Sequence, residues 1–164
     1  MYQIDEFVIH MTGGICQVKD IAPLEISGAD KSKKYYLLVP VKAATSKVYV
    51  PVDNDSAMRK IYTGDQAKKL IEEIPSIEET CIDNEKFREA KYREVIKSCD
   101  LHDLIGVLKN LYKRRLKRME EGKKNTATDD KYFKIVEENL ISELSFVLGK
   151  DKEEMKNLII DSIK

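Results

Sequence analysis

Cationic side chains are concentrated in one stretch of the sequence. Residues 111–125, LYKRRLKRMEEGKKN, carry seven Lys or Arg against two Glu, although the formal charge of the 164-residue chain is zero. Ammonium and guanidinium groups at this density can neutralise phosphates, so the stretch is a candidate contact for a nucleic-acid backbone. The alternative is a solvated helix face whose cations complement the negative end of the helix dipole.

Positive charge gathers in the middle of the chain. Residues 81–125 hold 13 basic and 8 acidic side chains, a balance of +5, whereas residues 1–80 balance at −2 and residues 126–164 at −3. Such asymmetry concerns partners and not the fold. Apolar residues at helical spacing in 101–119 leave Lys and Arg in rows at i and i+4 on another face. Because neighbouring segments add more cations, we predict a DNA-backbone surface made of Arg88, Lys91, Arg93, Lys97, Lys109, Lys113, Arg114, Lys117, Arg118, Lys123 and Lys124.

Phe87 lies away from the apolar positions of the helix that follows it. Measured at 100° per residue, it falls roughly opposite the stripe of Tyr92, Val95, Ile96 and Cys99. An off-stripe aromatic next to a cation could insert between base steps at a minor groove, so Phe87 joins the predicted DNA contacts. In the alternative, Phe87 precedes the helix and packs on the linker or the N-terminal domain.

Residue types that do catalysis are sparse and scattered. His10 and His102 fall in different halves, with no nucleophile linked to either, and the three cysteines form no metal-binding or disulfide spacing. EGKKNT (121–126) does not complete a phosphate-binding loop. We expect no enzyme, no cofactor and no metal. Without an apolar run of membrane length, and with an acidic opening MYQIDEF, we expect a cytoplasmic protein.

The first sixty residues have the pattern of short strands. EFVIHM, ICQVKDI, KYYLLVPV (34–41) and KVYVPV (47–52) are rich in β-formers, and Gly13-Gly14 indicates a hairpin turn. Pro40 and Pro51 must mark strand ends, bulges or edges, because proline donates no ladder hydrogen bond. Four or five such strands predict a small bent sheet or barrel, whose open edge would be a docking surface.

From Asp65 the pattern becomes helical. We predict a first helix capped by Asp65 and stopped by Pro75, then apolar stripes of two helices over 92–99 and 101–119, with Gly122 as a stop. Thr126 or Thr128 should cap the next helix, which ends near Gly149, and Asp151 should cap the last helix. The predicted fold is α+β: a β-rich domain over 1–62, a helix and linker over 63–82, and a compact all-α domain of about four helices over 83–164.

The ordered set of segments resembles a known family. YYLLVP, KVYVPVDN and MRKI, followed by KYREVIKSCDLHDLIGVLKNLYKRR and KYFKIVEENLISELSFVLG, are similar to the CarD-like bacterial transcription regulators in their firmicute form. The resemblance implies a Tudor-like or SH3-like barrel that docks on the RNA polymerase β subunit. It also implies a helical domain that meets promoter DNA at the upstream edge of the bubble and stabilises the open complex. We then expect a nucleoid-associated monomer.

The residues that match the family's docking strand are Lys47, Val48, Tyr49, Val50 and Pro51, with Arg59 just beyond. Val48 and Val50 share one face and could instead be barrel core. Many members carry a Trp near the first helix of the C-terminal domain, where this chain has only Phe87 nearby. The alternatives are an RNA-binding or ribosome-associated adaptor, and a polymerase-docking module without DNA contact.

Overall fold

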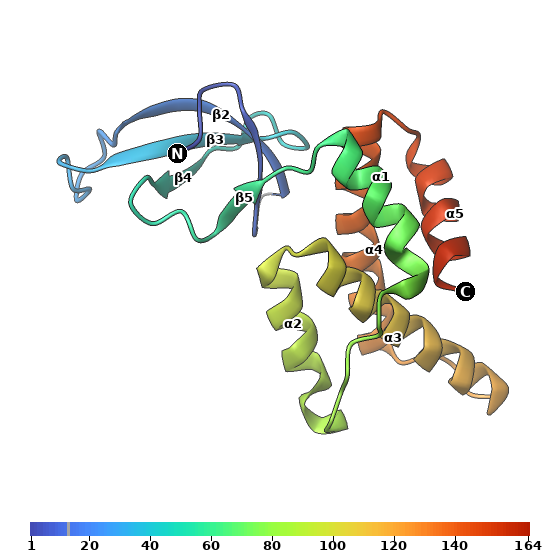
Figure 1. Ribbon diagram of the computed structural model, residues 1–164. Helices are drawn as coiled ribbons and strands as arrows, with labels where there is room; N and C mark the ends of the chain where they lie inside the picture. Colours follow the sequence, from blue (N-terminus) through green and yellow to red (C-terminus); the bar gives the residue numbers. More distant parts are fainter. Residues whose placement is uncertain (13) are drawn as a thin grey trace. The chain divides into compact units, whose positions relative to one another are not determined.

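The computed structural model describes residues 1–12 and 14–164, and the chain divides into two units, Met1–Ile61 and Tyr62–Lys164 (Figure 1). The first unit holds strands and the second holds helices, as the α+β prediction requires. Within the described residues, no helix combines the length and the apolar character needed to cross a membrane.

In the part of the first unit that the structure describes, five strands form one antiparallel sheet in the order β4-β3-β2-β1-β5. The strands are β1 Phe7–His10, β2 Gly14–Pro23, β3 Lys34–Pro40, β4 Val48–Pro51 and β5 Met58–Lys60. A register shift between Val18 and Asp20 marks a bulge in β2, and a bulge bends a strand and increases its twist. The sheet is therefore the small bent type that the sequence predicted.

Alternation along each strand creates the core of the sheet. In β3, Tyr36 and Leu38 are fully buried, whereas Tyr35 and Leu37 are only partly covered. The buried cluster comprises Val8, Cys16, Val18, Tyr36, Leu38, Val50 and Met58. Pro40 and Pro51 end β3 and β4, as predicted. The predicted turn joins β1 to β2, with Gly14 in the left-handed region at φ 64°, while Gly13 lies outside the described residues.

The second unit contains five α-helices and two short 3₁₀ helices. They are α1 Gly64–Glu73, η1 Ile74–Ser76, η2 Glu85–Phe87, α2 Arg88–Ser98, α3 Leu101–Glu120, α4 Ala127–Leu148 and α5 Lys152–Ile163. The predicted caps Thr126 and Asp151 are confirmed, and Gly149 ends α4 in the left-handed conformation. Asp100, which was not among the predicted caps, caps α3. The predicted cap Asp65 is wrong. Thr63 caps α1, because its hydroxyl and the Gln66 side chain complete a reciprocal capping box.

The helical core is assembled around α4, which contacts α1, α2, α3 and α5. Ala67 and Leu70 of α1 are buried in the same cluster as Leu104 and Leu140. The sequence assigned 63–82 to a helix and linker, but in the structure α1 is part of the helical unit, which begins at Tyr62 and not at residue 83. Packing across the unit, which the sequence pattern does not contain, sets this boundary.

The segment after η1 lies against α3. Thr80 donates its N–H to the carbonyl of Gly106 at 3.0 Å. A Cβ built on Gly106 would lie 2.8 Å from Thr80 Oγ1 and 3.1 Å from the Glu78 carbonyl oxygen, so only glycine allows this close approach. Residues 77–80 are therefore a strap fixed on α3.

Two parts of the predicted apolar stripes are wrong. Cys99 was placed on the stripe of the first helix, but it lies beyond Ser98 as the left-handed C-cap, at φ 56°. Leu116 and Met119 were placed on the inward face of the second helix, yet they are 42% and 64% exposed. The stripe continues past the part of α3 that the rest of the unit covers.

Candidate functional site

Among the described residues, strand β4 lies at one end of the strand order and has a neighbouring strand on one side only. Val52 donates its N–H to the carbonyl of Lys34 at 3.0 Å, continuing the β3–β4 ladder. Hydrogen-bonding direction alternates along an antiparallel strand. The backbone groups of Val48, Val50 and Val52 therefore face β3, and those of Lys47, Tyr49 and Pro51 face away from it. The outward set offers an N–H and a C=O at Tyr49, whereas Pro51 has no N–H and its C=O accepts from the N–H of Asn54 at 3.1 Å.

The side chains of the predicted docking residues separate into two groups. Val50 is 4% exposed and Val48 packs against the sheet core, so these two are core residues, an alternative that the sequence left open. Lys47 and Tyr49 are exposed, Pro51 is half-buried, and Tyr49 lies opposite Leu37 on the outer face. Arg59 is on β5, at the other end of the strand order, where its Nη1 donates to the Lys60 carbonyl at 3.0 Å.

In the helical unit, Phe87 occupies the last position of η2 and the N-cap position of α2. Phe87 precedes the helix, as the alternative interpretation expected. Its side chain is not packed against other parts of the chain as that interpretation also expected, because the residue is 60% exposed. Lys86 lies with Nζ 5.9 Å from the centre of the Phe87 ring. Lys86 was absent from the predicted surface, although its position beside an off-stripe aromatic was a usable signal.

Two of the predicted DNA contacts are instead held by a buried carboxylate. Asp129, in the first turn of α4, is 0% exposed. Its Oδ1 accepts from Arg88 Nε at 3.3 Å, and its Oδ2 accepts from Arg114 Nε at 3.1 Å. Arg114 also donates from Nη1 to Glu85 at 2.7 Å. Sequence reasoning missed Asp129, because a carboxylate in a first helical turn is ordinary and its burial depends on packing.

A second polar cluster ties α2 to α4. The hydroxyl of Tyr132 donates to Glu89 at 2.8 Å and accepts from Arg93 Nε at 2.9 Å, and Arg93 also pairs with Glu89. Its neighbour Tyr92 is fully buried and donates to Asn110 Oδ1 at 2.9 Å. Burial, followed by the charge of Asp129, raises the pKa of Tyr92 to about 12. Arg93 therefore links α2 to α4, with its side chain 60% exposed.

The row predicted along α3 is not a continuous free surface. Lys109 turns its ammonium group onto the backbone carbonyls of Ile74, Pro75 and Ile77, and burial lowers its pKa. Lys113 pairs with Glu79 at 2.6 Å. Both lysines hold the chain after α1 against α3.

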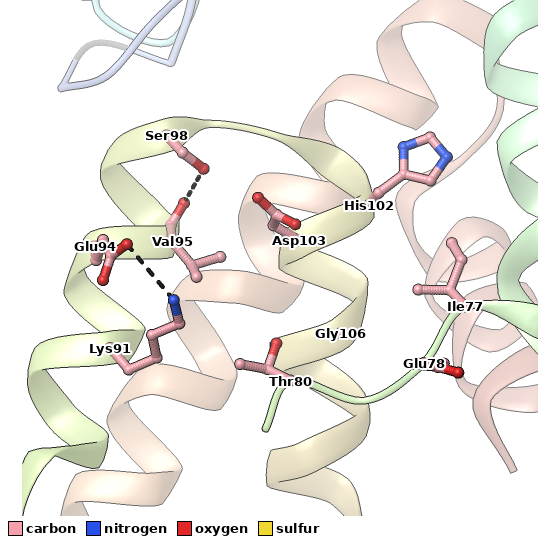
Figure 2. A pocket seen from close by; sticks show the side chains of 10 residues that line it. All are labelled: Ile77, Glu78, Thr80, Lys91, Glu94, Val95, Ser98, His102, Asp103 and Gly106. Carbon is pink, nitrogen blue, oxygen red and sulfur yellow. Dashed lines mark hydrogen bonds and ion pairs between the residues drawn. The ribbon is translucent and has the colours of Figure 1, made fainter. Parts of the chain in front are cut away.

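Lys91 belongs to a different surface (Figure 2). A pocket of about 350 Å³ lies between α2, α3 and the strap, and Lys91 lines it together with Glu78, Glu94 and Asp103. Lys91 Nζ pairs with Glu94 at 3.5 Å across one helical turn. The pocket lining carries carboxylates from three segments and a single lysine, so a phosphate in the pocket would meet repulsion.

The remaining predicted cations differ in how much they are engaged. Arg118 donates to the Lys124 carbonyl at 2.7 Å, and Lys123 pairs with Glu121 at 3.2 Å. Lys97, Lys117 and Lys124 have no ion-pair partner within residues 1–12 and 14–164. Arg114 ties α3 to η2, and Lys117 lies about one helical turn beyond Arg114 along α3. Lys97 is ten residues further along α2, about 15 Å by helical rise.

The described residues contain no group of three or more His, Cys, Asp or Glu that could hold a metal ion. His10 is buried and its Nδ1 accepts from the backbone N–H of Thr12 at 3.3 Å, and His102 is exposed beside Glu73. Each histidine has a protein partner. Each unit therefore has its own candidate site: the exposed edge of β4 in the first, and the exposed ring of Phe87 with nearby cations in the second.

The fold and the candidate sites define a two-domain protein, with an open-edged sheet followed by a helical unit that exposes an aromatic ring beside a cation. Comparison with family models identifies it further. Residues 2–62 match the CarD-like/TRCF RID domain and residues 66–160 match the CarD C-terminal domain. The chain belongs to the CarD-like family of RNA polymerase-interacting transcription regulators, and its sheet unit is Tudor-like. None of the curated proteins compared with the chain matches it.

Proposed function

We propose that this protein docks on the RNA polymerase β subunit through β4, contacts promoter DNA through the helical unit and stabilises the open complex. The observation that carries the DNA contact is the 60% exposure of Phe87 beside Lys86. The regulator acts as one copy, without a catalytic step or cofactor, on nucleoid DNA in the cytoplasm.

The docking mode rests on the free edge of β4. A partner strand added there would form backbone hydrogen bonds with Lys47 and Tyr49, Pro51 would contact it through its ring, and side chains would select the register. Val48 and Val50 support the strand from the core side and need not touch the partner. Arg59, on β5, does not belong to this edge and would act separately.

Substitution of Tyr49 tests the docking. Tyr49→Pro removes the outward backbone N–H of Tyr49, so a polymerase strand could no longer pair fully with β4. We therefore expect polymerase binding to weaken more than about tenfold. Tyr49→Phe keeps the backbone and the ring and serves as the matched control. Binding is measured by pull-down and by titrating purified polymerase onto the immobilised protein. Unchanged affinity for Tyr49→Pro contradicts docking at β4.

The DNA contact rests on a smaller set of residues than the sequence predicted. Phe87 would insert at a base step of the upstream fork, and Lys86, Lys117 and Lys124 would approach phosphates around it. Five of the predicted cations already bind partners inside the helical unit, namely Arg88, Arg93, Lys109, Lys113 and Arg114. Such a contact recognises the fork and the backbone and carries little base-sequence information.

Salt dependence on a forked promoter duplex tests the phosphate contacts. Lys117→Gln with Lys124→Gln should reduce the slope of log affinity against log salt by about two, since each phosphate that is no longer neutralised removes roughly 0.9. Lys68→Gln with Lys156→Gln removes the same charge from α1 and α5 and should leave the slope unchanged. Equal slopes for both pairs contradict the proposed surface. Preferential competition by single-stranded RNA would favour the RNA-adaptor alternative.

A further inference from the structure

The residues on both sides of Phe87 in the sequence form ion pairs with other helices. Glu85, two residues before it, pairs with Arg114 at 2.7 Å, and Arg88, the next residue, pairs with Asp129 at 3.3 Å. Only Lys86 and Phe87 lie between these tethers. The short segment that carries the ring is therefore fixed at both ends, to α3 on one side and to α4 on the other.

One guanidinium joins three elements of the unit. Arg114, on α3, donates from Nε to Asp129 of α4 and from Nη1 to Glu85 of η2. Asp129 is itself fixed, because its N–H donates to the Thr126 hydroxyl at 3.1 Å in the first turn of α4. A continuous chain of hydrogen bonds therefore runs from the α4 N-terminus to the segment before Phe87.

The backbone of η2 is held as well. Asn84 accepts from the N–H of Lys86 with its side chain at 3.0 Å, and its carbonyl accepts from the N–H of Phe87 at 2.9 Å. With the backbone fixed, the ring of Phe87 keeps only its side-chain rotations. Burial of an exposed aromatic ring is favourable, so a segment that could move freely would tend to turn the ring toward the protein interior.

We infer that Asp129, Arg114, Arg88 and Glu85 form a positioning network that holds the ring of Phe87 outward, ready for the fork. The inference rests on the proposed DNA contact of Phe87. The four residues carry two positive and two negative charges, so the network adds no net attraction for phosphate. Its two arginines serve DNA binding through Phe87 and not by direct contact.

The sequence offers a direct spectroscopic test, because the chain contains no Trp. Phe87→Trp introduces a single indole whose time-resolved fluorescence anisotropy reports local motion. Glu85→Ala in that background should lower the residual anisotropy by releasing one tether. Glu79→Ala is the matched control, because Glu79 also pairs with α3, through Lys113 at 2.6 Å, away from Phe87. Equal anisotropy for the two variants overturns the positioning role.

The functional test measures the lifetime of competitor-resistant open complexes formed by polymerase with the full-length protein. Glu85→Ala should shorten the lifetime about two- to fivefold, the range that follows from an exposed ion pair, and Glu79→Ala should not. In the Phe87→Ala background the same substitution should have almost no effect, because the network acts through the ring.

The outcomes separate the two proposals. An equal effect of Glu85→Ala with and without Phe87 overturns the inference while the proposed function stands. If Phe87→Ala leaves the lifetime unchanged, the proposed DNA contact is wrong, and a tether-dependent anisotropy still shows the ring to be positioned. Thermal melting of each variant identifies unfolding, which the 64% exposed Glu85 side chain makes a minor risk.

Discussion

The two units expose their proposed binding groups by different means. The sheet exposes backbone groups of β4 because β4 is the terminal strand, so strand order and an apolar core are sufficient. The helical unit exposes Phe87 from a segment held by ion pairs that converge on Asp129. An edge created by topology tolerates most single substitutions, whereas a ring held by charges depends on every partner.

The difference extends to what each unit buries. Among the described residues of the sheet unit, His10 is the only buried polar or charged side chain, whereas the helical unit buries Asp129, Glu143 and Ser145. Ionised groups in a core need partners, and losing one partner leaves an uncompensated charge. We therefore expect the helical unit to respond more strongly to substitutions and to pH.

The largest expected effect comes from Asp129. Asp129→Ala leaves Arg88 and Arg114 without their shared carboxylate, and breaking a buried ion pair typically lowers the free energy of unfolding by about 3–5 kcal/mol. Amide hydrogen exchange should show the loss in α2, α3 and α4 and not in β1–β5. Asp130→Ala is the neighbouring control, because its 48% exposed carboxylate pairs with Arg115 at the surface. Similar losses for the two variants would remove the distinction between the units.

Alkaline pH should destabilise the helical unit through Tyr92. Burial raises the pKa of Tyr92 to about 12, while an unfolded tyrosine ionises near 10.0. Between these values the unfolded chain releases the proton first, so the free energy of unfolding falls as pH rises above about 10, by roughly 2–3 kcal/mol in total. Denaturant titrations followed by circular dichroism measure this slope. Tyr92→Phe should flatten it, and an unchanged slope would contradict the assignment.

Acid should act on the sheet unit through His10. Burial lowers the pKa of His10 below its ordinary 6.5, so the unfolded chain binds a proton that the folded sheet resists. The stability of the sheet is complete above pH 6.5 and decreases as pH falls below that value. Hydrogen exchange in β1 measures the effect. His10→Gln should reduce the acid response of the sheet. His102→Gln is the control at the exposed histidine and should leave that response unchanged.

The smallest expected effect concerns two residues in the left-handed region, one in each unit. Cys99 has φ 56° and Asp5 has φ 71°. Glycine adopts this conformation without strain, and Asp tolerates it better than Cys. Cys99→Gly should raise the free energy of unfolding by about 0.5–1 kcal/mol, and Asp5→Gly by less. Denaturant melts of both variants provide the measurement, and a larger gain at Asp5 would contradict the ranking.

Local chemistry made much of the fold predictable. Thr126 and Asp151 cap helices because a side-chain oxygen placed before an apolar repeat satisfies the free N–H groups of the first turn. Asp65 failed as a cap because Thr63, two residues earlier, completes a box with Gln66. Leu116 and Met119 failed as core residues because a stripe does not reveal where its covering neighbours end.

The basic stretch at 111–125 shows the limit of charge counting. Seven cations predicted a continuous positive surface, and they lie on α3 or in the loop that follows it. The structure pairs Lys113, Arg114 and Arg115 with Glu79, Asp129 and Asp130 from other segments. These partners lie on other helices or loops, so a prediction based on sequence neighbours and periodicity contains no information about them.

The sequence by itself determined the strand and helix pattern, most caps and turns, the concentration of charge and the off-stripe position of Phe87, because these follow from interactions within a few residues. Only the tertiary structure decided which cations remain free, that Asp129 is buried between two arginines, that α1 joins the helical core, and that β4 ends the sheet. Those features arise from contacts between distant segments, whose geometry exists only once the chain has folded.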